Sequence, residues 1–312
     1  MFMPGSTGTN KVLGQQSAGI ETDKLVGNWI PGTGIVNTDS STEWGAGVPN
    51  YWQNQVSGGN HLRVYNCEAA DMVYSSPNHI APDGTNEYLG PASTNYGGSP
   101  FQLITERNWA ISIWLRPPSD SPTTGTNGVF SFGANLTYPN LVIEVITSDN
   151  YTDQFGTDTY SRLKYNLNGT AGAVRYTTIP DKLFTTPRWF NLTVISTGTQ
   201  RAPGTYYPSH AAHQAILING TVVDWWDGDF PSGSQENLYI GASALGGLAL
   251  NSYLGTGWLI GHVHVYQPDT SNAYDVPCLT VSKARQNYHA IAETYKSISN
   301  HRHYGDTSYG KF

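Results

Sequence analysis

Alternating apolar and polar positions recur along most of the chain and predict β-strands. In the segment 109–116 the residues Trp109, Ile111, Ile113 and Leu115 fall on one face, because successive strand residues point to opposite sides of a sheet. Further short segments rich in β-branched and aromatic residues predict strands at 129–132, 141–147, 162–167, 173–178, 189–195, 215–218, 221–226, 238–241 and 258–266.

Turn signals separate these segments. Asn168-Gly169 and Asn219-Gly220 each lie between two predicted strands, and Asn-Gly supplies the positive φ angles that a two-residue hairpin needs. Asp83-Gly84 opens a turn that leads into a strand near residue 88. We therefore expect tight antiparallel hairpins rather than long crossover connections.

One segment has helical rather than strand periodicity. Thr280 is a suitable N-cap. The apolar positions that follow it have the spacing of one helix face: Val281, Ala284, Tyr288, Ile291 and Tyr295. The sequence predicts a helix from about residue 281 to residue 296, and it is the one convincing helix.

Many strands and a single helix indicate an all-β fold. We expect two antiparallel sheets packed as a jelly-roll sandwich, with one short C-terminal helix. Residues 1–44 are rich in glycine and poor in large apolar side chains, so we expect an extended N-terminal arm. The jelly roll is expected over 45–296, and a polar tail over 297–312.

Composition narrows the class of function. Charged residues make up 12% of the 312 residues and the net charge is −7, so nucleic acid is not an expected partner. No apolar run is long enough for a membrane span, and the first residues lack the basic and apolar regions of a secretory signal. Cys67 and Cys278 are expected to be buried free thiols.

Seven segments, in order, resemble the concanavalin A-like, laminin-G-like jelly-roll family. They are DGTNEYL (83–89), WAISIWLRP (109–117), RWFNLTV (188–194), ILINGTVV (216–223), LYIG (238–241), the strand 258–266 and the closing helix from 279. The chain departs from the family pattern at 197–213, a longer insertion than usual, and after Ile260, where acidic residues are common in the family.

The resemblance implies a fold and leaves several functions open. Members include lectins, glycanases, pentraxin-like proteins and structural proteins of tailed-phage virions. The glycine-rich arm, the low charge and the closing helix look most like the phage proteins. The resemblance therefore implies a virion location, with other virion proteins and copies of the same chain as partners and host surface glycans as a further candidate.

Two candidate binding sites arise from the residues. Acidic side chains beside tryptophans suit a sugar, because an aromatic ring packs on the apolar face of the sugar. That group contains Trp225, Trp226, Asp227 and Asp229, next to Asp224. Oxygen ligands that lie close together in a polar loop suit calcium. That group contains Asp149, Asn150, Asp153 and Asp158, and calcium is the one cofactor that the sequence leaves open.

Two other features have simpler interpretations. In the last predicted strand His262 and His264 share a face with Ile260 and Tyr266. They have no third metal ligand in sight, so surface or interface histidines are expected. Glu144 is the nearest strand carboxylate, and it lies between apolar neighbours. No catalytic carboxylate pair, nucleophile elbow or phosphate loop is found, so no enzymatic activity is expected.

Three functions remain. The first is a non-enzymatic structural protein of a tailed-phage virion, as a capsid decoration or a tail or fibre component. The second is a lectin-like carbohydrate-binding module, which is compatible with the first. The third is a glycoside hydrolase, which would need a carboxylate pair that the sequence does not display.

Overall fold

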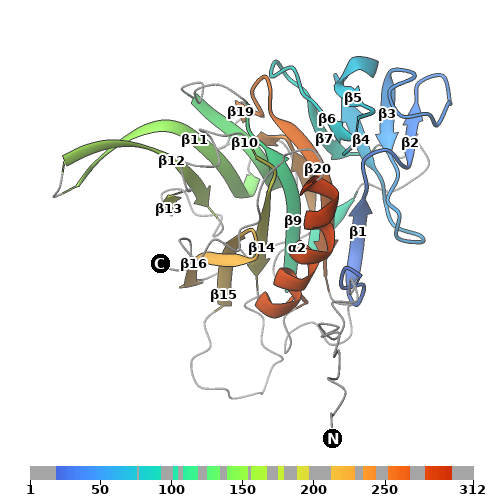
Figure 1. Cartoon of the computed structure of the whole chain (residues 1–312). Coiled ribbons are helices and arrows are strands. Elements are labelled where there is room, and N and C mark those ends of the chain that lie inside the picture. The colour runs from blue at the N-terminus through green and yellow to red at the C-terminus, as the bar shows by residue number, and fades with distance from the viewer. Residues whose placement is uncertain are drawn as a thin grey trace, which may run out of the picture.

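Most of the chain is described by the structure, which is a computed structural model. The described residues are 19–75, 77–92, 101–104, 108–118, 125–133, 139–153, 156–166, 175–178, 188–196, 212–228, 235–243, 252–267 and 278–296. Two antiparallel sheets face one another across a hydrophobic core, and one α-helix lies outside them (Figure 1). The expected all-β sandwich is confirmed.

The eight-stranded sheet has the order β16-β15-β14-β9-β20-β6-β5, and β1 also pairs with β20. Its strands are β16 (Thr221–Gly228), β15 (Ala212–Ile218), β14 (Phe190–Ser196), β9 (Trp109–Arg116), β20 (Leu259–Tyr266), β6 (His79–Ile80), β5 (Met72–Val73) and β1 (Leu25–Trp29). The predicted strands over 109–116, 189–195 and 258–266 form its centre, each within a residue or two of the expected bounds.

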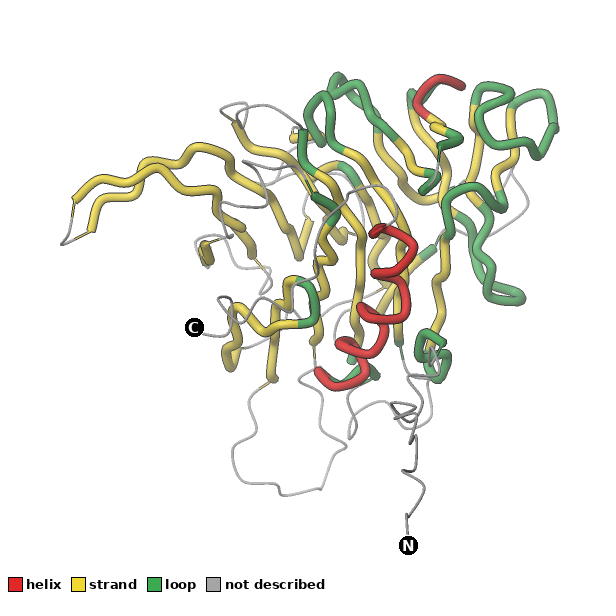
Figure 2. The backbone as a smooth tube through the Cα atoms, viewed as in Figure 1, coloured by secondary structure: helices red, strands yellow, loops and turns green. Residues whose placement is uncertain are grey.

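The ten-stranded sheet has the order β13-β12-β11-β10-β17-β7-β4-β3-β2, and β8 also pairs with β17. Its strands are β13 (Arg175–Thr178), β12 (Gly156–Asn166), β11 (Pro139–Asp153), β10 (Gly125–Gly133), β17 (Gln235–Ile240), β7 (Tyr88–Pro91), β4 (Leu62–Tyr65), β3 (Pro49–Trp52), β2 (Ile35–Asn37) and β8 (Gln102–Ile104). Figure 2 shows the long β11–β12 hairpin reaching out beyond the rest of the sandwich.

The core forms where the inward faces of the two sheets meet. Ile111, Ile113 and Leu115 of β9 are fully buried there. Phe130 and Phe132 of β10 enclose the same core from the ten-stranded sheet. This is the face that the alternation in 109–116 predicts, and its burial is the main source of stability in such a sandwich.

The Asn219-Gly220 hairpin is confirmed. It joins β15 to β16, and φ is 52° at Asn219 and 74° at Gly220. Both angles lie in the left-handed region that a type I′ turn requires at its two central residues. Asn168-Gly169 lies outside the described residues, although the strands on either side of it, β12 and β13, do pair.

The predicted helix is confirmed as α2 (Val281–Lys296). Thr280 accepts the Lys283 N–H through its side chain at 3.2 Å, as an N-cap does. The helix packs on the outer face of the eight-stranded sheet, where Tyr288, Ile291 and Tyr295 surround Trp114 of β9. This outer face is therefore covered.

Strand β20 differs from the expected register. A bulge lies between Ile260 and Val263, and a bulge shifts the residues that follow it relative to the faces of the sheet. Ile260 consequently belongs to the inner core with Val263, while Leu259 packs beside the helix. The expectation that Ile260 shares a face with the two histidines was wrong.

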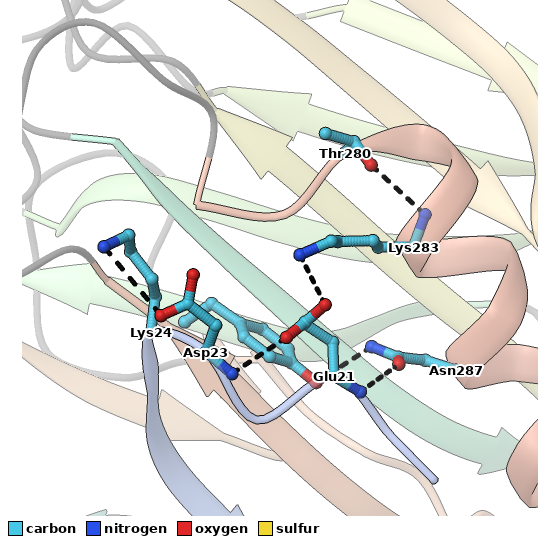
Figure 3. Close-up of polar contacts among 7 residues, drawn as sticks. Glu21, Asp23, Lys24, Thr280, Lys283 and Asn287 are labelled. Atoms are coloured by element: carbon cyan, nitrogen blue, oxygen red, sulfur yellow. Dashed lines mark hydrogen bonds and ion pairs between the residues drawn. The ribbon is translucent and has the colours of Figure 1, made fainter. Parts of the chain in front are cut away.

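The start of the chain also differs from expectation. We expected an extended arm over 1–44, but β1 is paired with β20 and β2 with β3, and Trp29 is fully buried. Residues before β1 contact the helix: the Glu21 N–H donates to Asn287 Oδ1 at 2.7 Å, and Lys283 pairs with the Glu21 carboxylate (Figure 3). Residues 1–18 and the expected tail at 297–312 lie outside the described residues.

Candidate functional site

The predicted sugar-binding group lies largely on the edge strand β16. Asp224, Trp225, Trp226 and Asp227 pair in order with Ile216, Ala215, Gln214 and His213 of β15. Asp224 is half-buried. Asp229 lies outside the described residues, as do the side chains of the two tryptophans and Asp227, so sugar binding at this group stays a prediction.

The predicted calcium group has a different local structure from the expected polar loop. Asp149, Asn150 and Asp153 are residues of β11, and Asp158 belongs to β12, where it pairs with Tyr151. The four residues therefore lie on the two strands of the β11–β12 hairpin. Their side chains lie outside the described part of the chain, and calcium binding there stays a prediction. Among the described side chains, no group of three or more histidines, cysteines or acids is arranged for a metal ion.

The two histidines of β20 lie beneath the helix, with His264 buried and His262 half-buried, which corrects the expectation of surface or interface histidines. Their rings stack with centroids 5.9 Å apart, and His264 is only 2% exposed. Tyr295 Oη accepts the backbone N–H of His262 at 2.8 Å and lies 2.6 Å from the ring atom Nδ1 of His262. The Tyr295 hydroxyl thus contacts both the backbone and the ring of His262. Burial lowers the pKa of His262 to about 4 and that of His264 to about 3.

Both cysteines are buried, and burial raises the pKa of the Cys278 thiol to about 12 and that of Cys67 further still. Thiols that hold their protons so firmly are poor nucleophiles and poor metal ligands.

The outer face of the ten-stranded sheet and the adjoining two-stranded sheet of β18 (Ala242–Ser243) and β19 (Ser252–Tyr253) carry a group of aromatic residues, most of them half-exposed, that sequence analysis missed. Strand β4 buries Leu62 and Val64 in the core, so Arg63 and Tyr65 belong to the opposite face. Cross-strand pairing sets Tyr88 of β7 beside Tyr65, and Tyr239 of β17 and Tyr253 of β19 complete the group. We call Arg63, Tyr65, Tyr88, Tyr239 and Tyr253 the tyrosine surface.

Close packing joins the rings of the tyrosine surface. Tyr65 and Tyr88 stack in parallel with centroids 4.5 Å apart, and the Arg63 guanidinium carbon lies 4.8 Å from the Tyr65 centroid. Tyr239 and Tyr253 lie 6.3 and 6.2 Å from Tyr88. Cross-strand contacts of this kind stabilise a sheet, and a cation over a ring adds attraction.

A glycine allows this close approach. Gly90 lies opposite Arg63 on β7, and a Cβ on Gly90 would come within 3.0 to 3.3 Å of the rings of Tyr88, Tyr65 and Tyr239. A side chain there would push the three rings apart. The rings thus converge over Gly90 because no side chain lies beneath them.

The chemistry of the tyrosine surface is mixed. Each ring offers an apolar body and a hydroxyl group, and Arg63 adds a planar set of donors. The hydroxyl of Tyr65 donates to the Pro91 carbonyl at 2.9 Å. Burial and the neighbouring Tyr65, Tyr253 and Tyr239 raise the pKa of Tyr88 to about 12, so its phenol is neutral. Four of these residues are only half-buried, with Tyr239 the most enclosed. A neutral, partly apolar ligand rich in hydroxyl groups is compatible with such a surface.

Comparisons with known proteins identify the fold. No protein-family model matches the chain, and no curated protein is significantly similar in sequence. Among solved structures, a Trypanosoma rangeli sialidase in complex with 2,3-difluorosialic acid superposes with a TM-score of 0.54 at 11% identity, covering 88% of this chain and 34% of the sialidase. A botulinum neurotoxin serotype D/C binding domain covers 86% of this chain and 52% of its own length, with a TM-score of 0.47 and 10% identity.

The chain thus spans about a third of the sialidase and half of the toxin domain. At this low identity the likeness shows the fold alone. The protein has a two-sheet antiparallel β-sandwich fold, which is consistent with the jelly roll that the sequence resemblance implied. In the described part of the chain, no helix is both long and apolar enough to cross a bilayer.

Proposed function

We propose that the protein is a non-enzymatic, lectin-like module that binds glycans through the tyrosine surface. The observation that carries this proposal is the convergence of four tyrosines and Arg63, from four separate strands, on one outer face where most of them stay partly exposed. Exposed aromatic clusters cost free energy in water and mark interaction sites.

The physical argument favours a sugar. Tyrosine rings offer a large rigid contact area at a small cost in side-chain entropy, and hydroxyl and guanidinium donors hydrogen-bond to ligand oxygens. Pyranose rings combine apolar C–H faces with hydroxyl groups, so they match both components. Non-enzymatic action is part of the proposal, and turnover of oligosaccharides that is lost on changing Glu144 or Asp227 would contradict it.

A glycan array probed with the purified chain, with and without calcium, tests the proposal. We expect binding that Tyr88→Ala weakens at least tenfold, because this ring contacts three others of the surface. Tyr74→Ala is the matched control, since Tyr74 is 73% exposed and follows β5 of the other sheet. Equal binding by the two variants, or no binding to any glycan, would refute the proposal.

A second candidate is a structural protein of a tailed-phage virion, bound to other virion proteins and to copies of itself. The low charge favours it, because the buried centres of protein interfaces are depleted in lysine and glutamate. The two functions are compatible, since a virion protein can also bind host glycans. Mass spectrometry of purified virions is the direct test, and a stable monomer that occurs in no particle would contradict this candidate.

A further inference from the structure

The turn 83–87, directly before Tyr88, contains a buried carboxyl group. Glu87 is 3% exposed. Its Oε2 accepts the N–H groups of Asp83 at 2.7 Å and of Gly84 at 3.0 Å, and its carboxyl group is hydrogen-bonded to the carboxyl group of Asp83. A carboxyl buried in this way forms the centre of the turn.

Two carboxyl groups that share a hydrogen bond must hold one proton between them. Asp83 is exposed to water and its Oδ1 accepts the N–H of Thr85 at 2.9 Å, and both favour its ionised form, whereas the Glu87 carboxyl group is buried. Glu87 therefore carries the proton and donates it to Asp83. In agreement with this assignment, burial and then the hydrogen bond to Asp83 raise the pKa of Glu87 to about 7, while hydrogen bonds from Thr85 hold the pKa of Asp83 below its usual value.

The other titratable groups around Glu87 also oppose its ionisation. Asp71, at the end of the short 3₁₀ helix η1 (Ala69–Asp71), adds negative charge, and the neighbouring Cys67 is a buried thiol. The loop that packs on the turn contributes Thr256, which is uncharged. Loss of the Glu87 proton would thus place a buried carboxylate against the carboxylate of Asp83.

The turn is tied firmly to the tyrosine surface. Thr256 Oγ1 donates to the Asp83 carbonyl, and Asn66, which follows β4, donates through Nδ2 to the Asn86 carbonyl at 3.0 Å. A Cβ on Gly84 would collide with the backbone nitrogen of Thr256, so the turn has little room to shift. Because Tyr88 directly follows Glu87, a rearrangement of the turn moves the ring that contacts Tyr65, Tyr239 and Tyr253.

We propose that the proton on Glu87 controls the position of Tyr88, so that the tyrosine surface binds its glycan more tightly when Glu87 is neutral than when it is ionised. This inference rests on the proposed function for its ligand. It makes the site pH-sensitive near neutrality, with affinity falling as the pH rises.

The test compares the full chain with Glu87→Gln, which keeps an acceptor for the two N–H groups and a donor toward Asp83. The first measurement needs no ligand: the ring resonances of Tyr88, in tyrosine-labelled protein and assigned with Tyr88→Phe, are followed from pH 5.5 to 8.5. We expect a transition centred near pH 7 that Glu87→Gln abolishes. His61→Gln is the control, because His61 titrates on the same outer face, where it stacks on Tyr51, and it should leave the transition intact.

The second measurement repeats the glycan array at pH 5.5 and 8.5. Binding by the unaltered chain should weaken severalfold at the higher pH, while Glu87→Gln should bind equally at both. Glycan binding without a Tyr88 transition, or a transition that persists in Glu87→Gln, would overturn the inference and leave the proposed function intact. A Glu87-dependent transition without any glycan binding would support the coupling and refute the proposed function.

Discussion

The outer faces of the two sheets carry similar aromatic stacks in different surroundings. On the eight-stranded sheet Trp114 stacks on Tyr295 with centroids 4.4 Å apart and an interplanar angle of 14°. On the ten-stranded sheet Tyr65 stacks on Tyr88 at 4.5 Å and 10°. The first pair lies beneath helix α2 and both its residues are 2% exposed, whereas the second pair is half-exposed. Ring geometry alone thus fails to separate packing from binding, and exposure is the property that distinguishes the two faces.

The covered face also contains a set of buried, hydrogen-bonded polar groups. Asn191 Nδ2 donates to Ser112 Oγ at 2.8 Å, and Thr193 Oγ1 donates to Asn191 Oδ1 at 2.8 Å. Asn287 of the helix donates to the Tyr266 hydroxyl at 2.9 Å. These hydrogen bonds give the named groups partners in place of water. The covered face is therefore a second core, and we expect its variants to affect folding rather than binding.

The largest expected effect is on stability at the covered face. Trp114→Ala should lower the free energy of unfolding by about 3–5 kcal/mol, because it removes a buried ring between β9 and α2. Tyr65→Ala on the open face should cost about 1 kcal/mol or less, the value of a cross-strand pair. Urea unfolding of both variants measures the difference, and equal losses would contradict the contrast between the two faces.

Acid should selectively weaken the covered face. The folded-state pKa values of His262 and His264, about 4 and about 3, lie below the usual 6.5, so the unfolded chain binds protons more readily. Their contribution is fully present above pH 6.5 and is lost as the pH falls toward 4, which should cost about 3 kcal/mol for each histidine. Unfolding measured from pH 7 to 4 should show a shallower loss for His264→Gln. His289→Gln, on the exposed side of α2, should keep the full slope.

Removing one member of the polar set should have an intermediate effect. Asn191→Ala removes one partner from each of the buried hydroxyl groups of Ser112 and Thr193 and leaves them the 3.1 Å contact with one another, which should cost about 2 kcal/mol. Thermal and urea unfolding measure the loss. Unchanged glycan binding by the folded variant would sharpen the separation between the two faces, whereas a selective loss of binding would contradict it.

The smallest expected effect on stability is at the contact between the residues before β1 and helix α2. Lys283 and Glu21 form an ion pair at the surface, and such pairs add little because water and salt screen them. Lys283→Ala should leave the unfolding transition nearly unchanged at physiological salt. A marked drop in the midpoint would mean that residues before β1 stabilise α2 more than a surface contact does.

Sequence alone was sufficient wherever the signal is local. The alternation in 109–116, the hairpin at Asn219-Gly220 and the helical spacing after Thr280 predict β9, the β15–β16 turn and α2, because each depends on residues within a few positions of one another. β1 and β2 escaped prediction because their residues are short segments among glycines. β1 is a strand because it pairs with β20, which is distant in sequence. β2 is a strand because it pairs with β3, whose own strand signal in the sequence is weak.

Only the tertiary structure determined the candidate site. Tyr65, Tyr88, Tyr239 and Tyr253 are spread over 189 positions, and strand order brings them to one face. The same is true of His262 and His264: their spacing of two places them on one face, but the helix that covers this face begins fifteen residues after β20 ends. Periodicity specifies which residues share a face of one strand. The packing of the whole sandwich determines which strands become neighbours and which face is then covered. For this reason only the tertiary structure distinguishes the second core from the tyrosine surface.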